Sequence, residues 1–416
     1  MAFLIRTHDG LPPEETALVD RGLGEANDAA APLHEVEPLS CFAHAESGQV
    51  IGGAVGRRWG RCCELQQLWV EPSHRRQGVG AGLVRAFEAR AIEHGCTTFY
   101  LETFNFQAPA LYRSLGYTVA YEHEVYPHGI VKSIMVKEQA GPVEAFLAAF
   151  HDERPGLTPK AFAALPVMFQ GAARASSYEA LAATVPPTSD PLSVLDLACG
   201  DGYLLSMLAA RAQPGLQLGG VDLSAGELAA ARERLGPEVS LAQARAQRLP
   251  YAPARFDVVL CHMALMLMDD AEQVLREIRR VLKTGGRFGA IVGAPPPPSA
   301  ALDLYVKAIS RHARQPRWDA VRFGDRRLRT LEGIAELLAP GFSEVAIEEM
   351  HVSLRLTPGG LWLRLLDMYD LYLLDPAARL AVERELYESA AAACGPDGML
   401  DFPIALRYIG ATASGA

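Results

Sequence analysis

Two glycine-rich turns, about 120 residues apart, hold the residues best placed to do chemistry in this chain. The first is Arg75-Arg76-Gln77-Gly78-Val79-Gly80, and the second is Asp196-Leu197-Ala198-Cys199-Gly200-Asp201-Gly202. Glycine lets a ligand approach the main-chain amides, and such amides attract anions where a helix begins. Because the two turns differ in their residue types, we expect two enzymes in one polypeptide. Each would bind its own group donor, a molecule that carries a nucleotide.

Strand and helix signals surround the first turn. Residues 64–70 are typical of a strand, and apolar residues recur at helical spacing from Leu83 until Gly95. Residues 40–55 are also strand-like, and the turn-rich residues 56–60 separate the two runs, which indicates antiparallel sheet. The amides of Arg76 to Ala81 are therefore expected to face a pyrophosphate.

This segment resembles motif A of the GNAT acetyltransferases, whose R-x-x-G-x-G loop is met by Arg75, Gly78 and Gly80. Residues 105–117 are similar to a second family signature, N-x-x-A-x-x-x-Y-x-x-x-G-F/Y. The resemblance covers about residues 40–137 and implies acetyl-CoA as the donor. The residues that it implies for cofactor binding are Leu68, Trp69, Val70, Arg75, Arg76, Gln77, Gly78, Val79, Gly80, Ala81, Asn105 and Ala108.

Acetyl transfer to an amine needs a proton acceptor for the ammonium and a proton donor for the leaving thiolate. By the resemblance, Tyr112 is the acid, and the alternative is an aromatic side chain that packs in the core. Glu64 opens the strand and is the candidate base, directly or through water, or else a solvated charge at a strand end. Glu102, His123 and His128 are competitors for the base.

The second turn follows a buried-strand run, residues 193–197, and precedes a helix predicted over residues 203–211. The next strand, residues 219–223, contains Asp222, which lies 20 residues after Gly202. A carboxylate at that strand end can accept two ribose hydroxyls. The turn lacks the G-x-G-x-x-G spacing of dinucleotide folds, so the better resemblance, over residues 190–413, is to the class I S-adenosylmethionine-dependent methyltransferases.

That resemblance implies S-adenosylmethionine as the donor. Its implied contacts are Asp196, Ala198, Gly200 and Gly202 around the methionine part, Asp222 on the ribose, Leu223 against the adenine, and Ala246, Gln247 and Cys261 nearby. One position departs from the family pattern, because Arg245 stands where relatives commonly carry an acid that meets the adenine amino group. A donor thus replaces an acceptor, for which Gln247 or a backbone carbonyl could compensate.

His262 is the candidate base for methyl transfer, since it ends the predicted fourth strand, where ligands of open parallel sheets gather. The alternative is a hydrogen-bonded core histidine. The strand end reads Cys-His-Met-Ala, unlike the Asn/Asp-Pro-Pro-Tyr/Phe motif of methyltransferases that act on base or amide nitrogens. This difference weakens a nucleic-acid-modifying role.

The sequence predicts an α/β protein of two domains. Residues 1–140 form a GNAT-like domain with a mixed, mostly antiparallel sheet, and residues 191–416 form a Rossmann-like seven-stranded methyltransferase sheet. Residues 141–190 are a linker with helices that precede or cover the methyltransferase site, and a helical pattern runs over residues 162–183. Helical insertions at residues 299–340 and 357–396 are expected to cap the acceptor pocket.

Composition narrows the partners. The 416 residues carry a net charge of −10, which removes the broad basic field that polyanions require, so small-molecule substrates are favoured over nucleic acid. The seven cysteines form no CxxC pair, so no metal site is expected. No run of about 18 apolar residues occurs, so we expect no membrane association and a cytoplasmic protein.

The leading hypothesis is a bifunctional transferase that N-acetylates with one domain and methylates with the other, at two steps of one small-molecule pathway. A second hypothesis keeps the methyltransferase active and makes the GNAT-like half a binding or regulatory module. A third, a nucleic-acid modifier, is opposed by the acidic balance. The sequence names neither acceptor, nor the methylated atom, nor the oligomeric state.

Overall fold

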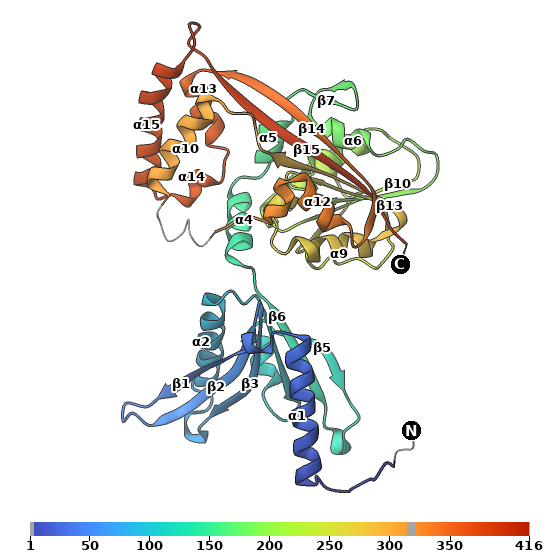
Figure 1. The fold of residues 1–416 in the computed structure, drawn as a ribbon, viewed down its shortest axis with the longest axis vertical. Helices are drawn as coiled ribbons and strands as arrows, with labels where there is room; N and C mark the ends of the chain where they lie inside the picture. The colour runs from blue at the N-terminus through green and yellow to red at the C-terminus, as the bar shows by residue number, and fades with distance from the viewer. Residues whose placement is uncertain (1–3, 314–320, 416) are drawn as a thin grey trace. The chain divides into compact units, whose positions relative to one another are not determined.

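The computed structural model describes residues 4–313 and 321–415. The chain divides into two compact units, Met1–Gly141 and Pro142–Ala416 (Figure 1). Both are mixtures of helices and strands, as the sequence predicts. Part of the first predicted insertion, residues 314–320, lies outside the described residues. Within the described ranges, no helix has the length and apolar character needed to cross a bilayer.

The first unit is built on a six-stranded sheet in the order β1-β2-β3-β4-β6-β5. Strands β3 and β4 run parallel, and the other neighbours run antiparallel. The helices and strands are α1 (Pro13–Ala30), β1 (Glu37–His44), β2 (Val50–Trp59), β3 (Cys62–Val70), α2 (Val79–Glu93), β4 (Thr98–Phe104), α3 (Pro109–Ser114), β5 (Thr118–His123) and β6 (Lys132–Glu138).

The core of this unit lies between helix α2 and one face of the sheet. Alternate side chains of β4, such as Phe99 and Leu101, pack there with Leu65 of β3 and Phe87 of α2. This alternation follows from the two-residue period of a strand, and the apolar stripe of α2 covers the face that it produces.

Strands β3 and β4 separate toward their carboxyl ends. Their pairing runs from Cys62 opposite Thr98 to Leu65 opposite Leu101 and is not continued, although β3 extends to Val70. On its other side, β3 is shifted in register against β2 between Val55 and Gly56. A register shift of this kind bends a strand and increases its twist. The end of β3 therefore carries main-chain groups that β4 does not use.

Gly56 lies inside strand β2, which continues to Trp59, so the predicted turn over residues 56–60 is too long. The turn between β2 and β3 lies at Gly60 and Arg61, and Gly60 has a φ of 55°. A Cβ at Gly56 would lie 1.9 Å from the carbonyl oxygen of Glu64 and 2.9 Å from the ring of Phe87. Glycine is thus required by close packing in a strand rather than by a turn.

The second unit is built on a seven-stranded sheet in the order β11-β10-β9-β12-β13-β15-β14. Strand β15 runs antiparallel to both neighbours, and the pairs from β11 to β13 are parallel. The strands are β9 (Leu192–Leu197), β10 (Leu216–Asp222), β11 (Ser240–Gln243), β12 (Phe256–His262), β13 (Leu282–Ala294), β14 (Phe342–Leu356) and β15 (Leu400–Ala413), with a small hairpin of β7 (Val167–Phe169) and β8 (Ala172–Arg174).

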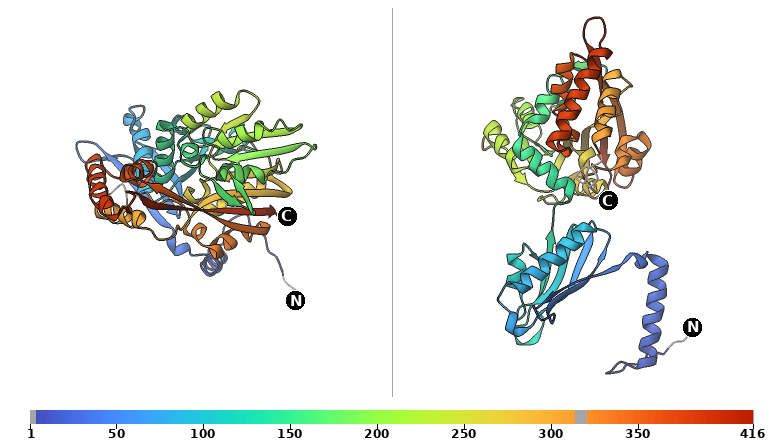
Figure 2. Two further views of the ribbon diagram at one scale, coloured as in Figure 1. Left: turned by 90° about the horizontal axis from the view of Figure 1, so that it is seen from above. Right: turned by 90° about the vertical axis from the view of Figure 1, so that its left-hand side faces the viewer.

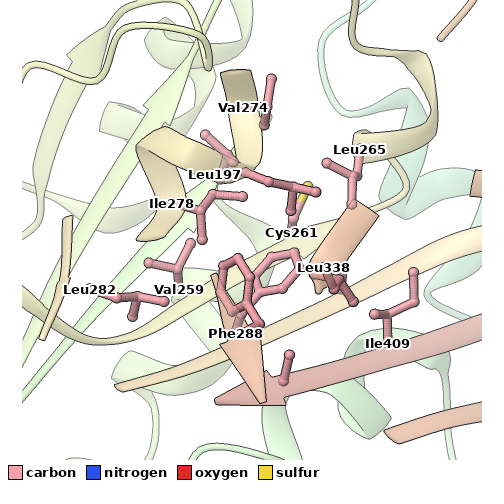
Figure 3. Packing of buried hydrophobic residues seen from close by; sticks show 14 of the residues in the cluster. Leu197, Val259, Cys261, Leu265, Val274, Ile278, Leu282, Phe288, Leu338 and Ile409 are labelled. Carbon is pink, nitrogen blue, oxygen red and sulfur yellow. The ribbon is translucent and has the colours of Figure 1, made fainter. Parts of the chain in front are cut away.

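Helices cover both faces of this sheet (Figure 2). They are α4 (Pro142–Glu153), α5 (Leu157–Phe162), α6 (Ser177–Ala183), α7 (Tyr203–Ala209), α8 (Ala225–Leu235), α9 (Ala271–Val281), α10 (Ala300–His312), α12 (Leu331–Leu338), α13 (Pro358–Leu365), α14 (Asp370–Leu373) and α15 (Pro376–Ala393). On one face, Val259 and Cys261 of β12 pack against Ile278 of α9 and Leu338 of α12 (Figure 3). On the other, Leu260 packs with α6 and α7. A strand buried on both sides explains the uninterrupted apolar runs of the sequence.

Strands β14 and β15 are longer than predicted and carry a separate helical cluster. They pair from Phe342 opposite Ala413 to Leu356 opposite Leu400. Figure 1 shows α10, α13, α14 and α15 gathered beside their far ends. Trp362 of α13 and Val382 of α15 are buried there against Phe402 of β15. Helix α10 of the first predicted insertion and the helices of the second therefore form one packed body with the ends of two sheet strands, whereas α12 of the first insertion belongs to the main core.

The helix predicted over residues 162–183 is wrong. Helix α5 ends at Phe162, the β7–β8 hairpin follows, and α6 begins at Ser177 with the Ser176 hydroxyl capping the amide of Glu179. Alanine and apolar residues at helical spacing suggested one long helix, but the turn at Gln170 and Gly171, both with positive φ, breaks it.

Gly56→Ala is expected to destabilise the first unit. Its methyl group would overlap the Glu64 carbonyl, and overpacking of this kind costs about 1–3 kcal/mol. The control is Gly24→Ala in α1, where a Cβ meets nothing within 4 Å. Calorimetric unfolding should show a lower melting temperature for Gly56→Ala alone. Equal melting temperatures for the two variants would contradict the close approach at Gly56.

Candidate functional site

The loop after β3 presents main-chain amides at the start of α2. Gly78 is the residue before the helix and has a φ of 87°, and no side chain caps the helix there. The first four amides of an α-helix have no acceptor within the helix. A Cβ at Gly78 would meet nothing within 4 Å. The loop thus has the open, positively polarised surface that the sequence predicts for a phosphate site.

The loop, the end of β3 and the start of α3 lie close together. A Cβ at Gly80 would lie 3.7 Å from Val70 of β3 and 3.5 Å from Leu111 of α3. The guanidinium of Arg75 donates to the carbonyl oxygen of Val70 at 2.9 Å. The structure therefore brings together predicted residues from three segments of the sequence: Leu68 to Val70, Arg75 to Ala81, and Ala108, which directly precedes α3.

Tyr112 is buried in α3, with its ring edge against Tyr117 at 5.9 Å between ring centroids. Burial raises the pKa of the Tyr112 hydroxyl, so this group remains protonated at neutral pH and suits a proton donor better than a base. Asn105 is exposed, and its side-chain amide donates to the carbonyl oxygen of Gly129 at 2.9 Å. In this arrangement Asn105 holds the loop before β6.

Glu64 lies opposite Tyr100, within the part of β3 that still pairs with β4. Its carboxylate is 2.6 Å from Nε of Arg57 and 3.2 Å from Nε2 of Gln66. The candidate base is thus already engaged by a cation. Glu102 forms an ion pair with Lys132, and His123 contacts the hydroxyl of Tyr121 at 3.2 Å. The role of Glu64 stays a prediction.

A cavity lies at the carboxyl ends of the parallel strands in the second unit. Its volume is about 860 Å³, including the part that is open to solvent. Seven of the predicted residues line it: Ala198, Gly200, Asp222, Leu223, Ala246, Gln247 and His262. The residues come from the ends of β9, β10, β11 and β12. We call this cavity the donor cavity.

Asp222 joins two of the loops that form the donor cavity. One carboxylate oxygen accepts from the amide of Gly200 at 2.8 Å, and the other accepts from the amide of Ser224 at 2.9 Å. Burial raises the pKa of this carboxyl group, and the two amides act against that rise. A carboxylate has about four acceptor positions, so Asp222 can hold both loops and still receive ribose hydroxyls.

Three predicted donor contacts lie behind the wall of the donor cavity. Gly202 has a φ of 76°, and a Cβ there would come within 2.7 Å of Leu235 of α8, so this glycine permits helix packing. Cys261 belongs to the core between β12 and α9 (Figure 3). Asp196 is buried, burial raises its pKa, and its Oδ1 has no hydrogen-bond partner in the described part of the chain.

His262 lines the donor cavity and is otherwise buried. Its ring stacks on Tyr178 at 3.6 Å between ring centroids, and its Nε2 lies 2.9 Å from the hydroxyl of Ser177. Nδ1 has no partner among the described residues. Burial lowers the pKa of His262 to about 3, so the imidazole is neutral at pH 7 and a weak proton acceptor. Its role as a base stays a prediction.

Helices α4 and α5 supply cavity residues that the sequence did not single out. Glu144, Leu147 and His151 of α4 and Thr158 of α5 line the donor cavity, as does Tyr369, the residue before α14. The covering segment itself was predicted, but these side chains follow no known motif. Only the helical spacing of Glu144, Leu147 and His151 shows that they share one face.

Hydrogen bonds fix α4 against the donor cavity. The ring of His151 lies between Glu227 of α8 and the hydroxyl of Tyr369, at 2.9 Å from each. Asp152 accepts from the hydroxyl of Ser224 at 2.6 Å and from the amide of Gly226 at 2.9 Å, at the start of α8. Helix α4 is therefore an integral wall of this site.

A second cavity, of about 1130 Å³ counted in the same way, adjoins the donor cavity and shares four lining residues with it. The shared residues are Thr158, Met263, Leu267 and Tyr369. Its other walls come from α5, from the segment after β12 and from both predicted insertions. In that order, they include Phe162; Met266; and Phe323, Asp325, Leu328, Arg329, Asp367, Met368 and Asp370. We call it the acceptor cavity.

Two aspartates of the acceptor cavity differ in their surroundings. Hydrogen bonds from Arg327 lower the pKa of Asp325. Asp370 is largely buried, which raises its pKa, and it accepts a hydrogen bond from the hydroxyl of Tyr305 at 3.2 Å. The cavity thus combines mainly apolar walls with a few fixed polar groups, as is usual for small-molecule sites.

Two family models match the chain. Residues 8–117 match the acetyltransferase (GNAT) family, and residues 194–286 match a methyltransferase domain. Blasticidin-S acetyltransferase of Streptomyces morookaense is 38% identical over 111 residues, which are 26% of this chain and 82% of that protein. Demethylmenaquinone methyltransferase of Thermus thermophilus is 40% identical over 117 residues, which are 27% of this chain and 52% of that protein.

Among solved structures, the YcgJ protein of Bacillus subtilis is similar with a TM-score of 0.40 and 21% identity, covering 58% of this chain and 99% of that one. The chain spans most of the curated acetyltransferase but about half of the curated methyltransferase. The residues that match the methyltransferase domain model, 194–286, include most of those that line the donor cavity.

Asp222→Ala is expected to weaken the binding of S-adenosylhomocysteine at least tenfold, because hydrogen bonds to a charged group contribute about 1.5–3 kcal/mol each. Isothermal titration calorimetry measures the affinity, and thermal unfolding of the same samples reports any loosening of the two loops. Asp257→Asn is the control, since Asp257 bonds Ser193 and Lys283 away from the cavity. An unchanged affinity in Asp222→Ala would rule out its ribose role.

His262 should make the second unit sensitive to acid. Because its pKa is about 3 when folded and about 6.5 in a free chain, only the unfolded chain binds this proton between these pH values. The stability present above pH 6.5 is then lost as pH falls, by about 1.4 kcal/mol per pH unit. His262→Asn should lose less stability than the wild type between pH 7.5 and pH 5.5 in thermal unfolding.

The exposed His351 provides the comparison for this measurement, as His351→Asn should follow the wild type. If His262→Asn shows the same pH dependence as the wild type, the imidazole is not held neutral by burial.

Proposed function

Because the chain belongs to the GNAT acetyltransferase family through its first unit and carries a methyltransferase domain in its second, we propose a bifunctional transferase. It transfers acetyl from acetyl-CoA to an amine and methyl from S-adenosylmethionine, with small molecules as acceptors. The observation that carries the proposal is the acceptor cavity, which adjoins the donor cavity and shares Met263 and Tyr369 with it.

The donor cavity fits S-adenosylmethionine. The Asp222 carboxylate suits ribose hydroxyls, and Leu223, Ala246 and Leu197 offer apolar surface for a base. The bound sulfonium would supply an activated methyl group. The chain's own part is to place the acceptor in line with that group and to exclude water, which α4 and α5 do by covering the cavity. The neutral ring of His262, stacked on Tyr178, forms part of the cavity wall.

The first unit fits acetyl-CoA. The loop around Gly78 presents its main-chain amides to a pyrophosphate, and the free end of β3 presents strand groups to an extended amide chain. The bound thioester would supply the activated acetyl group. Tyr112, held protonated by burial, can then donate a proton to the leaving thiolate.

Small-molecule acceptors are supported by the size of the acceptor cavity and by the net charge of −10. The acetyltransferase relative is named after blasticidin S. For this chain we propose only that the acetyl acceptor is a small molecule with an amine. The fusion of both units in one chain supports their action in one biosynthetic pathway.

Tyr112→Phe should lower the kcat for acetylation about 10²- to 10⁴-fold, the usual contribution of a positioned acid, with little change in the KM for acetyl-CoA. The measurement supplies the full chain with both donors and a metabolite extract, and mass spectrometry detects acetyl and methyl gains. Methylation should be unchanged in this variant, and Tyr117→Phe, which alters the neighbouring ring, is the control.

Methyl gains without any acetyl gain in the wild type would support instead a methyltransferase with a non-catalytic GNAT-like module. Methylation of transfer RNA in preference to the extract would point to a nucleic-acid modifier. If neither group is transferred to any compound, the proposed function is wrong.

A further inference from the structure

The structure gives Arg245, the residue that departs from the family pattern, a carboxylate partner on another element. Nε and Nη2 of Arg245 both lie 2.9 Å from Oε1 of Glu144 in α4. Both residues line the donor cavity, and their side chains are 18% and 7% exposed. An acid is thus present beside the loop after β11, although the loop itself carries a base.

We propose that Glu144 supplies the acceptor for the 6-amino group of adenine, in place of the acid that the loop after β11 lacks. The inference rests on the proposed use of S-adenosylmethionine as the methyl donor. Arg245 would act as a positioning residue, since its guanidinium holds the carboxylate over the end of the cavity that Leu223 and Ala246 also line. The acid would therefore reach the base from the covering helix rather than from the sheet.

The chemistry of the pair permits this role. A carboxylate has about four acceptor positions, so it can accept from an exocyclic amine while it holds Arg245. A guanidinium has only donors, so the acceptor within this pair is Glu144. Buried charges are retained where they are paired, so Arg245 stabilises the charged form of the Glu144 side chain beside the loop after β11.

The position of Glu144 is fixed by the rest of α4. His151, seven residues later on the same helix, bonds Glu227, and Asp152 bonds the start of α8. A Cβ at Gly226 would lie 2.8 Å from the backbone of Asp152, so the two helices are in close contact. Glu144 is thus held by a rigid contact network and not by a mobile loop.

The alternative acceptor named by the sequence, Gln247, is held by two hydrogen bonds. Its side-chain Nε2 donates to the backbone carbonyl oxygen of Asp269 at 2.8 Å, and its backbone carbonyl oxygen accepts from Nε2 of Gln273 at 2.9 Å. These bonds tie the loop after β11 to the start of α9. They fix the backbone and the amide nitrogen of Gln247. Glu144 differs from Gln247 in carrying a charge, and a charged acceptor forms the stronger hydrogen bond.

Two ligands test the proposal in the full chain by calorimetry. S-adenosylhomocysteine has the 6-amino group, and S-inosylhomocysteine has an oxygen there, which reverses the hydrogen-bond polarity. The wild type should prefer the adenosyl ligand about tenfold or more. Glu144→Ala should lose this preference, because the carboxylate that would accept from the 6-amino group is removed.

The double variant Glu144→Ala/Arg245→Asp should recover the preference, since it returns an acid to the loop. Glu153→Ala is the matched control, because it removes a carboxylate from the exposed face of the same helix and should keep the wild-type ratio. Circular dichroism verifies folding. If Glu144→Ala does not fold, Glu144→Leu serves, because it fills similar space without an acceptor, and it too should lose the preference.

An equal loss of affinity for both ligands in Glu144→Ala, with an unchanged ratio, would show that the pair only fastens α4 and would overturn the inference. If the wild type binds neither ligand, the proposed methyl donor is wrong instead. The two failures are therefore distinguishable in one set of titrations.

Discussion

The second unit depends on carboxylates that bind backbone amides at the carboxyl ends of its parallel strands. Asp222 bonds the amides of Gly200 and Ser224, and Glu227 bonds the amide of Gly156 at 2.9 Å. Charges are costly to bury unless several donors satisfy them. The amides that bind these two carboxylates belong to the loops that the carboxylates hold together. The same hydrogen bonds therefore set both the shape of the donor cavity and the negative charge within it.

The first unit forms its site by a different route. The separation of β3 from β4 exposes main-chain hydrogen-bonding groups at the end of β3. The shift in register between β2 and β3 at Gly56 is part of the same irregularity of β3. The amides at the start of α2 complete the site without any buried carboxylate. The site of the first unit thus relies on backbone amides, and that of the second unit on carboxylates held by backbone amides. This difference is consistent with the charges of the two donors, since acetyl-CoA carries an anionic pyrophosphate and S-adenosylmethionine a cationic sulfonium.

Sequence patterns predicted the features that follow from local geometry. Glycines with positive φ at 78 and 200, and an acid at the end of β10, lie where the strand and helix periodicities put them. The patterns failed at Gly56, where a tertiary contact and not a turn requires glycine, and over residues 162–183, where alanine-rich spacing hid a hairpin. They also missed Glu144 and Tyr369, because residues far apart in the chain meet at the cavity only after folding.

The extension of β14 and β15 past the rest of the sheet separates two packed regions of the second unit. Residues at the far ends of these strands, such as Leu354 and Phe402, anchor the helical cluster, while the ends near Phe342 and Ala413 stay in the main core. Met368 packs against this cluster and also lines the acceptor cavity, so a change in the cluster reaches that cavity without altering the strands that carry the donor cavity. Two continuous strands thus keep a peripheral module in register with the main sheet.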